Sequence, residues 1–414
     1  MSSYETSLRS ALSSMPSAGH VTLILPFTPA LLPDPTPLLP IIFQALIALP
    51  EIALFVYFST PPGVSEKHDQ LYDVLSQNPR ANFDVLQSFL AQVYATLAAG
   101  QWESGKVDVS VDVGFAGVVA GQEKRISEES ELVLYLDDYE PAGILASTPN
   151  SIQRYSLPSP SFPSSSSSTS TFAPSPPSPG PRVVALGGTF DHLHAAHKLL
   201  LQLAHFLSTR KLIVGVMSDS LLSSKDHSEY IEPGPTREWA VKDFLLSLSG
   251  DGRAETKRIE LNVLEIHDGF GPTRDEEDIQ ALVISEETKS GGEAVNALRK
   301  KNGLAELEVW SIDVISAGTL RALYGTGEEG EDGIVGLGME GAGRSGRSGR
   351  SGRKSPEYGS EGVSSTKSGI LKGLDEKRLK AEKMGSTAIR KRLAEGKAYE
   401  ERQRSGGNSV RGEL

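Results

Sequence analysis

The chain has 414 residues, with 53 acidic and 41 basic side chains and a formal net charge of −12. This length allows two domains, and the acidic balance excludes a general attraction to nucleic acid or anionic lipid, so we expect no nucleic-acid partner. Cysteine is absent, which removes disulfides, thiolate nucleophiles and cysteine metal ligands. Because that absence fits a reducing compartment, we expect a cytoplasmic protein.

The N-terminal segment 1–15 lacks the basic-then-apolar layout of a secretory signal. The most apolar window, Ile41–Phe58, is close to the minimum length of a membrane span, but it contains Gln44, Pro50 and Glu51. We interpret the window as a buried helix followed by a buried strand, and we expect no membrane span.

Residues 1–155 are expected to form a smaller α/β domain. Apolar residues at helical spacing predict a helix over 83–97, and a second helix is expected over Ile41–Leu49. Strand-like runs occur at Val21–Leu25, Ile52–Phe58, Val107–Val113 and Leu132–Leu136. No phosphate loop, metal-ligand cluster or nucleophile signature occurs in this part of the sequence, so its role is not readable from sequence.

Composition sets the remaining boundaries. Residues 156–181 are mostly Ser and Pro and cannot bury enough apolar surface to offset their ordering entropy, so they are predicted to be a disordered linker. An acidic run and Arg-Ser-Gly repeats predict a disordered insertion over 325–372, and 406–414 are expected to be a frayed tail. The second domain is therefore assigned to 182–324 and 373–405.

In the second domain, apolar runs alternate with helical patterns. This alternation predicts a Rossmann-like, doubly wound parallel sheet, in which ligands bind beyond the carboxyl ends of the strands. The runs that predict strands are Val183–Gly188, Lys211–Met217, Ile259–Leu264, Ala281–Ile284 and Leu307–Val314, and the predicted helices include Leu199–Leu207, Thr236–Leu248, Ala294–Lys301 and Leu379–Ala398.

The first of these strands ends in Gly187 and Gly188, and Thr189 follows. Glycine lets the backbone approach an anion closely, and the helix that comes next offers free N–H groups and a positive dipole end. His194 and His197 are expected to project from the first turn of that helix toward the same pocket. A zinc site would need a third ligand that the sequence does not supply, so no metal ligand is predicted.

These residues resemble a known motif. Gly188–Asp191 with His194 and His197 resembles the G-T-F-D and H-x-G-H opening of the nucleotidylyltransferase superfamily, with Ala196 in place of the motif's glycine. Further blocks resemble the eukaryotic type of phosphopantetheine adenylyltransferase. These are Ser218–Lys225, Tyr230–Pro233, Thr236–Glu238, Leu282–Asn296 and Gly385–Arg390, the last being similar to I-S-S-T-x-x-R with Gly385 for its first serine.

The resemblance implies transfer of AMP from ATP to 4′-phosphopantetheine, giving dephospho-CoA and pyrophosphate in coenzyme A synthesis. It implies catalytic roles for three residues. His197 would donate to the α-phosphate, Thr189 would hold the attacking phosphate, and Lys225 would bridge the two phosphates. Such chemistry depends on positioning and positive charge.

ATP binding is implied for Gly187, Gly188, His194, His197, Ser386, Thr387 and Arg390. Lys289 is a candidate on the acceptor side, with Thr189 and Lys225. Mg²⁺ would accompany ATP, held mainly by phosphates. Asp191 is expected to brace the turn.

Three alternatives accompany this reading. The acceptor could instead be nicotinamide mononucleotide or phosphocholine. The chain could be a non-catalytic scaffold among other coenzyme A synthesis enzymes, which are also candidate partners of an active enzyme. A bifunctional enzyme would need a G-x-x-x-x-G-K-[ST] kinase loop after the transferase, and none occurs in the sequence, so a monofunctional enzyme is predicted.

Overall fold

The computed structural model describes residues 6–7, 19–50, 53–61, 70–117, 120–162, 178–249, 259–312 and 385–406. The insertion predicted over 325–372, most of the predicted linker and the tail beyond Gly406 lie outside these residues. The described residues form two α/β units, each built on a five-stranded parallel sheet.

The N-terminal unit confirms the expected α/β organisation. Its sheet has the order β3-β2-β1-β4-β5. Helix α4 is longer than predicted, because Pro79 starts it and buried small residues continue its apolar face beyond Leu97. The elements are β1 (His20–Pro26), α2 (Leu39–Ala48), β2 (Ala53–Ser59), α3 (Leu71–Ser76), α4 (Pro79–Ser104), β3 (Val111–Phe115), α5 (Ala120–Glu129), β4 (Ser130–Leu136), α6 (Ala142–Ser147) and β5 (Gln153–Leu157).

The second unit is the predicted doubly wound sheet, in the order β10-β9-β6-β7-β8. Its elements are β6 (Val183–Gly188), α7 (Ala195–Leu207), β7 (Lys211–Met217), α8 (Gly234–Ser249), β8 (Glu260–Ile266), β9 (Ala281–Ser285), α9 (Lys289–Lys301), β10 (Glu308–Ile312) and α12 (Ser386–Gly406). Short 3-10 helices lie at η1 (Asp219–Leu221), η2 (Ser228–Tyr230), η3 (Gly271–Arg274) and η4 (Glu286–Thr288).

The two sheets have the same strand order when each is numbered from its own first strand. In both, the first strand lies at the centre, the second and third continue to one side, and the fourth and fifth to the other. The direction in which successive strands are added to the sheet therefore reverses between the first and fourth strands, although all strands stay parallel. In doubly wound folds a ligand crevice forms at this reversal.

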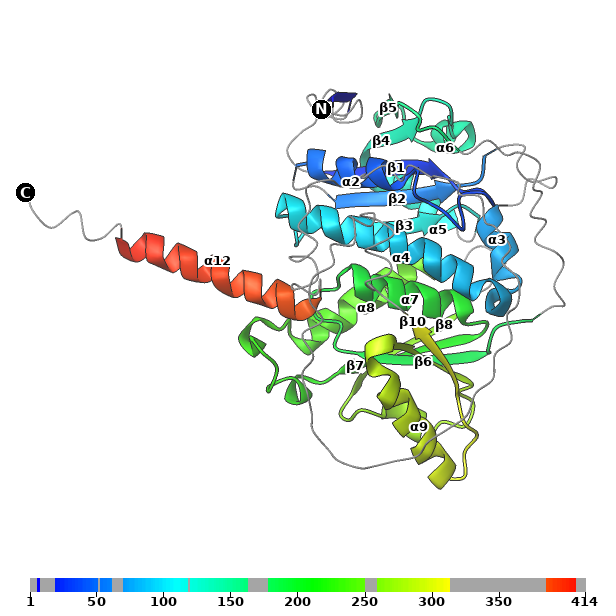
Figure 1. Cartoon of the computed structure of the whole chain (residues 1–414), viewed down its shortest axis with the longest axis vertical. Helices are drawn as coiled ribbons and strands as arrows, with labels where there is room; N and C mark the ends of the chain where they lie inside the picture. Colours follow the sequence, from blue (N-terminus) through cyan, green and yellow to red (C-terminus); the bar gives the residue numbers. More distant parts are fainter. Residues whose placement is uncertain are drawn as a thin grey trace, which may run out of the picture.

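Instead of lying apart, the two units pack against each other. Figure 1 shows the sheets one above the other, with α4 and α7 between them. One continuous apolar cluster includes buried residues of both units, and the Tyr94 hydroxyl on α4 donates to the Gln202 side chain on α7 at 2.8 Å. The two units therefore share one apolar cluster across their boundary. Nearly every residue of α7 is buried, because its own sheet covers one side and α4 the other.

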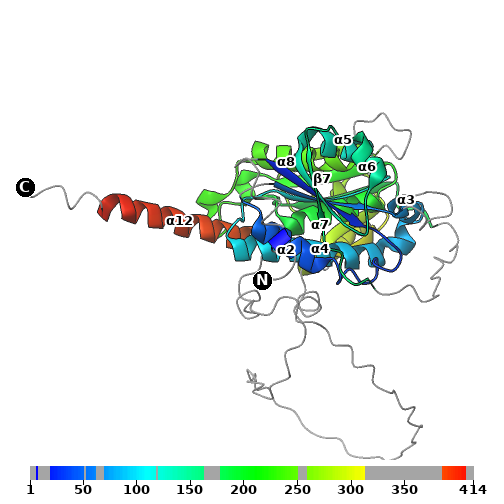
Figure 2. The same ribbon diagram turned by 90° about the horizontal axis from the view of Figure 1, so that it is seen from above.

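Two predicted boundaries shift slightly. Strand β5 continues to Leu157, two residues into the predicted linker, because its last residue is fully buried. Among the described residues, α12 begins at Ser386, and Figure 2 shows it running outward from the body of the molecule. The search of the described residues found no helix with the length and apolar character that a bilayer crossing requires.

Candidate active site

The turn after β6 is held in a backbone conformation that ordinary residues rarely adopt. Phe190 and His192 have φ angles of 51° and 46°, in the left-handed region. Gly187 and Gly188 are not the left-handed positions, since they are the last residues of β6 and pair with Gly215 and Val216 of β7. Strain of this kind persists where surrounding contacts determine the backbone, and it is frequent at ligand sites.

The buried carboxylate of Asp191 fixes this turn. One of its oxygens accepts from the backbone N–H of Glu232 at 2.9 Å, and the other pairs with the Arg390 guanidinium at 2.6 Å. Glu232 in turn accepts from the backbone N–H of His192 at 2.7 Å. The expectation that Asp191 braces the turn agrees with this arrangement.

His194 occupies the N-cap position of α7, with an extended backbone and no side-chain hydrogen bond to the helix. The first N–H groups of α7 are therefore without a side-chain cap. The rings of His194 and His197 stack with centroids 3.9 Å apart and an interplanar angle of 22°. A helix start that bears two imidazoles and uncapped N–H groups suits an anion such as phosphate.

Both imidazoles are held neutral. Burial, followed by the neighbouring His192 and Lys198, lowers the pKa of His194 to about 3. Burial, followed by His194 and Lys225, lowers the pKa of His197 well below its usual range. The Nδ1 atoms of His194 and His197 are buried, with no hydrogen-bond partner among the described residues. A tautomer with the proton on Nε2 avoids burying an unpaired donor, and in His197 it leaves Nε2–H for a ligand.

Lys225 and Thr189 meet although they lie on different loops. The Lys225 ammonium donates to the Thr189 hydroxyl at 2.9 Å. Burial and the Arg390 charge lower the pKa of Lys225, and the Asp191 carboxylate opposes them. A hydroxyl and an ammonium in contact, beside a helix N-terminus, form a second point at which a phosphate oxygen could bind.

Arg237 holds these loops together, and its side chain is completely buried. Its guanidinium donates to the carbonyl oxygens of Thr189 at 2.7 Å, Met217 at 2.8 Å and Glu232 at 2.8 Å, and pairs with Asp219 at 2.5 Å. Asp219 and Arg237 both lie in sequence blocks that resemble the family, but the sequence assigns no role to either residue. The partners are mainly backbone carbonyls, which leave no signal in a sequence.

The start of α12 completes the site from a distant part of the chain. The Ser386 hydroxyl lies 3.2 Å from Nε2 of His194 and donates to the Asp191 carbonyl at 3.1 Å, across 192 and 195 positions of sequence. The Arg390 guanidinium donates to the Thr387 hydroxyl at 3.2 Å and is 1% exposed. Arg390 is thus engaged in the buried pair with Asp191.

Gly385 and Ala196, the two departures from the family motifs, lie beside this group. A Cβ on Gly385 would be 4.0 Å from Nε2 of His194, which is ordinary contact. Ala196 is the second residue of α7 and is partly exposed. Lys289 does not join the group, because its ammonium pairs with Glu286 at 3.3 Å, at the end of β9.

Mg²⁺ would find no protein cage in the described part of the chain, where no group of three or more His, Asp or Glu is close enough to hold a metal ion. Nearby carboxylates already have partners, since Asp191 pairs with Arg390 and Asp219 with Arg237. This donor set fits an ion that arrives with a nucleotide and keeps phosphate oxygens and water as ligands.

Comparison with known proteins identifies the second unit. The sequence profile of the family described as cytidylyltransferase-like matches residues 185–322. An uncharacterized protein of Schizosaccharomyces pombe is 44% identical over 133 residues, covering 32% of this chain and 40% of that protein. The phosphopantetheine adenylyltransferase of Saccharomyces cerevisiae is 39% identical over 133 residues, covering 32% of this chain and 41% of the yeast protein.

The phosphopantetheine adenylyltransferase of Methanothermobacter thermautotrophicus is 33% identical over 135 residues, covering 33% of this chain and 75% of the archaeal protein. The chain thus spans about two fifths of the two fungal relatives and three quarters of the archaeal one. With its Rossmann-like sheet and a matching profile over the segment that bears the paired histidines, the chain belongs to the nucleotidylyltransferase superfamily, as a relative of the phosphopantetheine adenylyltransferases.

Proposed function

We propose that the protein is a monofunctional phosphopantetheine adenylyltransferase of the eukaryotic type, which transfers AMP from ATP to 4′-phosphopantetheine. The observation that carries the proposal is the meeting of Thr189 with Lys225 beside the stacked pair of His194 and His197. Thr189 and Lys225 suit the acceptor phosphate, and the histidine pair suits the α-phosphate of the nucleotide. The related enzymes of yeast and Methanothermobacter support this choice of acceptor.

In the proposed reaction, a phosphate oxygen of 4′-phosphopantetheine attacks the α-phosphorus of ATP in line. The bond from that phosphorus to the bridging oxygen breaks, and pyrophosphate leaves with the electron pair. Negative charge grows on the α-phosphate oxygens in the transition state, where positioned donors are most effective. The neutral His197 would donate its Nε2–H there, because Nδ1 is buried.

Thr189 and Lys225 would hold the acceptor phosphate, with Lys225 placed to bridge the two reacting phosphates. His194, Ser386 and Thr387 would bind the remaining phosphates of ATP, together with the uncapped N–H groups of α7. Gly187 and Gly188 would line the floor of the site. Mg²⁺ bound to ATP would neutralise phosphate charge. Lys289, at the start of α9 and paired with Glu286 outside this group, would meet only a more distant part of the acceptor.

The test is an acceptor panel with the purified full-length chain. ATP is supplied with 4′-phosphopantetheine, nicotinamide mononucleotide or phosphocholine, and products are separated by chromatography. The proposal expects dephospho-CoA from the first acceptor, with much slower turnover of the other two. Turnover of another acceptor without dephospho-CoA would replace the proposal, and no turnover with any of them would favour a scaffold role.

We also propose that the protein is cytoplasmic and that it contacts other enzymes of coenzyme A synthesis. Both can be tested on a tagged full-length chain by cell fractionation and by mass spectrometry of co-purified proteins. Recovery in an organelle fraction would contradict the first, and the absence of such enzymes from the co-purified set would contradict the second.

A further inference from the structure

The residue after His197 reaches out of the catalytic unit. Lys198 is buried, and its ammonium pairs with the Asp112 carboxylate at 2.6 Å. It also donates to the Val111 carbonyl at 2.9 Å and the Ser110 hydroxyl at 3.3 Å. The hydrogen bonds of this ammonium therefore all go to the N-terminal unit, at the start of β3.

The same contact pattern recurs one turn further along α7. The Gln202 side chain donates to the Val113 carbonyl at 3.2 Å and accepts from the Tyr94 hydroxyl at 2.8 Å. Among the described strands, β3 lies at the edge of its sheet and pairs with β2. Its outward carbonyl groups would otherwise lie unpaired at an open sheet edge, and α7 supplies their donors.

Asp112 is anchored within its own unit. Its second oxygen pairs with Arg125 at 2.8 Å, and the Arg125 guanidinium lies over the Phe55 ring at 4.7 Å from the centroid. Burial alone would raise the pKa of Asp112, but Lys198 and Arg125 together hold it well below its ordinary range. Asp112 is therefore a fixed anion that fixes the position of Lys198.

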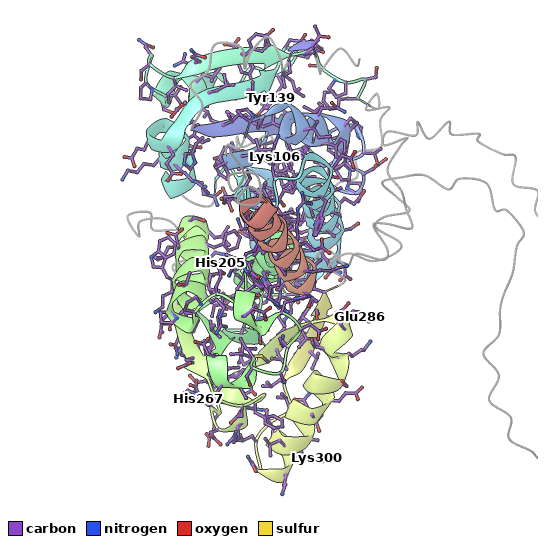
Figure 3. The ribbon with its side chains drawn as sticks, turned by 90° about the vertical axis from the view of Figure 1, so that its left-hand side faces the viewer. Lys106, Tyr139, His205, His267, Glu286 and Lys300 are labelled. Carbon is purple, nitrogen blue, oxygen red and sulfur yellow. The ribbon has the colours of Figure 1, made fainter. Side chains whose placement is uncertain are left out.

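The N-terminal unit also contacts the other half of the site. The Arg392 guanidinium, on α12, lies 5.6 Å from the Trp102 ring centroid and donates to the Gly105 carbonyl at 3.4 Å, at the end of α4. Figure 3 shows α12 at the level where the two units meet. Both helices that carry candidate phosphate-binding residues are thus held by this unit.

Beside the reversal point of the N-terminal sheet, packed aromatic rings cover the carboxyl ends of β1, β2 and β3. Phe27 follows β1 directly, and its ring lies 6.0 Å from Phe58 of β2 and 4.9 Å from Phe115 of β3, between centroids. These three side chains are at most 2% exposed. A packed crevice argues for a supporting role rather than a second nucleotide site.

We propose that the N-terminal unit is a positioning element of the transferase site, and that Asp112 is the positioning residue, holding the first turn of α7 in place through Lys198. This inference rests on the proposed function. A group that must meet a transition state is effective only within a fraction of an ångström, and misplacement by about 1 Å can reduce the rate about a hundredfold. His194 and His197 lie on the turn that Lys198 fixes.

Two variants of the full-length chain test this role. Asp112→Asn keeps the side-chain shape but leaves the Lys198 ammonium without an anion, which also lowers stability. Lys198→Met removes the ammonium and leaves Asp112 paired with Arg125, so it is the safer variant for folding. The matched control is Tyr94→Phe, which removes the next buried hydrogen bond of the same boundary without touching the first turn.

For both test variants we expect kcat to fall between tenfold and a hundredfold per folded molecule, with the KM for ATP changing less than about threefold. Lys198→Arg should recover part of the loss, because it restores a cation that can reach Asp112. The ring signals of His194 and His197 in ¹H–¹⁵N NMR spectra should move in Lys198→Met and stay in place in Tyr94→Phe.

If the wild-type chain forms dephospho-CoA and Lys198→Met keeps the wild-type kcat and ring signals, the positioning role is wrong while the proposed function stands. If the wild-type chain turns over no acceptor, the proposed function fails. In that case the histidine ring signals alone test the positioning role. Unchanged ring signals in Asp112→Asn and Lys198→Met would overturn it. Equal losses of kcat in Tyr94→Phe and Lys198→Met would show that the contact between the two units only supports the fold, and would overturn the positioning role.

Discussion

At the scale of single residues, the central feature is a pair of neutral histidines. Two stacked imidazoles could not both carry a proton at the start of a helix without repelling each other and its dipole. Burial and the cations Lys198 and Lys225 keep both rings uncharged. Each neutral ring keeps one N–H that can donate to a phosphate oxygen.

The residue-scale prediction is that His194 and His197 do not titrate near neutral pH in the ligand-free protein. An ordinary histidine titrates near pH 6.5, whereas the pKa of His194 is lowered to about 3. Between these values only the unfolded chain binds the extra proton, so the stability contributed by neutral His194 is complete above about pH 6.5 and declines toward pH 3. NMR titration of the ring signals checks this, and a midpoint above pH 6 for both rings would contradict it.

Thr189, His194, His197 and Lys225 were predicted because a motif keeps their chemistry within short stretches of sequence. The structure brings these four together. The buried partners Arg237 and Asp112 were not identified, because their roles come from contacts with backbone carbonyls and with a lysine in the other unit. Spacing along the chain carries no information about such contacts.

At the scale of elements, the docking of α12 depends on one buried ion pair. Arg390 is fully buried against Asp191, and it also donates to the Asp226 carbonyl at 3.1 Å. A buried pair is strongly destabilising when one partner is removed, because an uncompensated charge stays behind. Without Arg390, the Asp191 carboxylate would keep, among the described residues, the hydrogen bond from the Glu232 N–H and the His192 imidazole at 3.7 Å.

Arg390→Ala is therefore expected to weaken the docking of α12 by about 3–5 kcal/mol and to expose residues 385–406 to protease. Limited proteolysis followed by mass spectrometry measures the protection of this segment. The control is Lys391→Ala, whose side chain is 60% exposed and whose pair with Glu395 contributes at most about 1 kcal/mol. Equal protection of α12 in Arg390→Ala and in the wild type would show that the pair does not hold the helix.

Most strands of both sheets could be predicted from the sequence, because buried parallel strands consist of continuous apolar runs. The prediction misjudged the ends of α4 and did not include β5, an edge strand in which Leu157 is the one buried residue. The approach of α12 to β6 was inferred from a family motif at Gly385–Arg390. Periodicity alone could not place that helix.

At the scale of the whole molecule, the two units form one folding unit. The apolar cluster extends from the N-terminal sheet through α4 and α7 into the second sheet, and the Tyr72 and Phe206 rings meet across it at 5.6 Å. This contact could not be predicted from the sequence, because an apolar helix face has the same residue pattern whether its own sheet or a neighbouring unit covers it.

Residues 178–414 expressed alone are therefore expected to aggregate, since the face of α7 that α4 covers would be exposed to water. Co-expression with residues 1–162 should return a soluble complex that co-purifies. Light scattering measures the aggregation, and thermal unfolding shows whether the chain has a cooperative transition. A soluble, monomeric 178–414 with a cooperative transition would contradict the dependence of the second unit on the shared apolar cluster.

The central claim is that His197 acts on the transferred nucleotidyl group, and its most direct test is the turnover of His197→Ala with ATP and 4′-phosphopantetheine. Removal of one transition-state donor should reduce kcat about 10²- to 10³-fold, with an unchanged circular dichroism spectrum and melting temperature. His267→Ala, at a side chain that is 73% exposed, should match the wild type. Wild-type turnover by a folded His197→Ala would contradict the account.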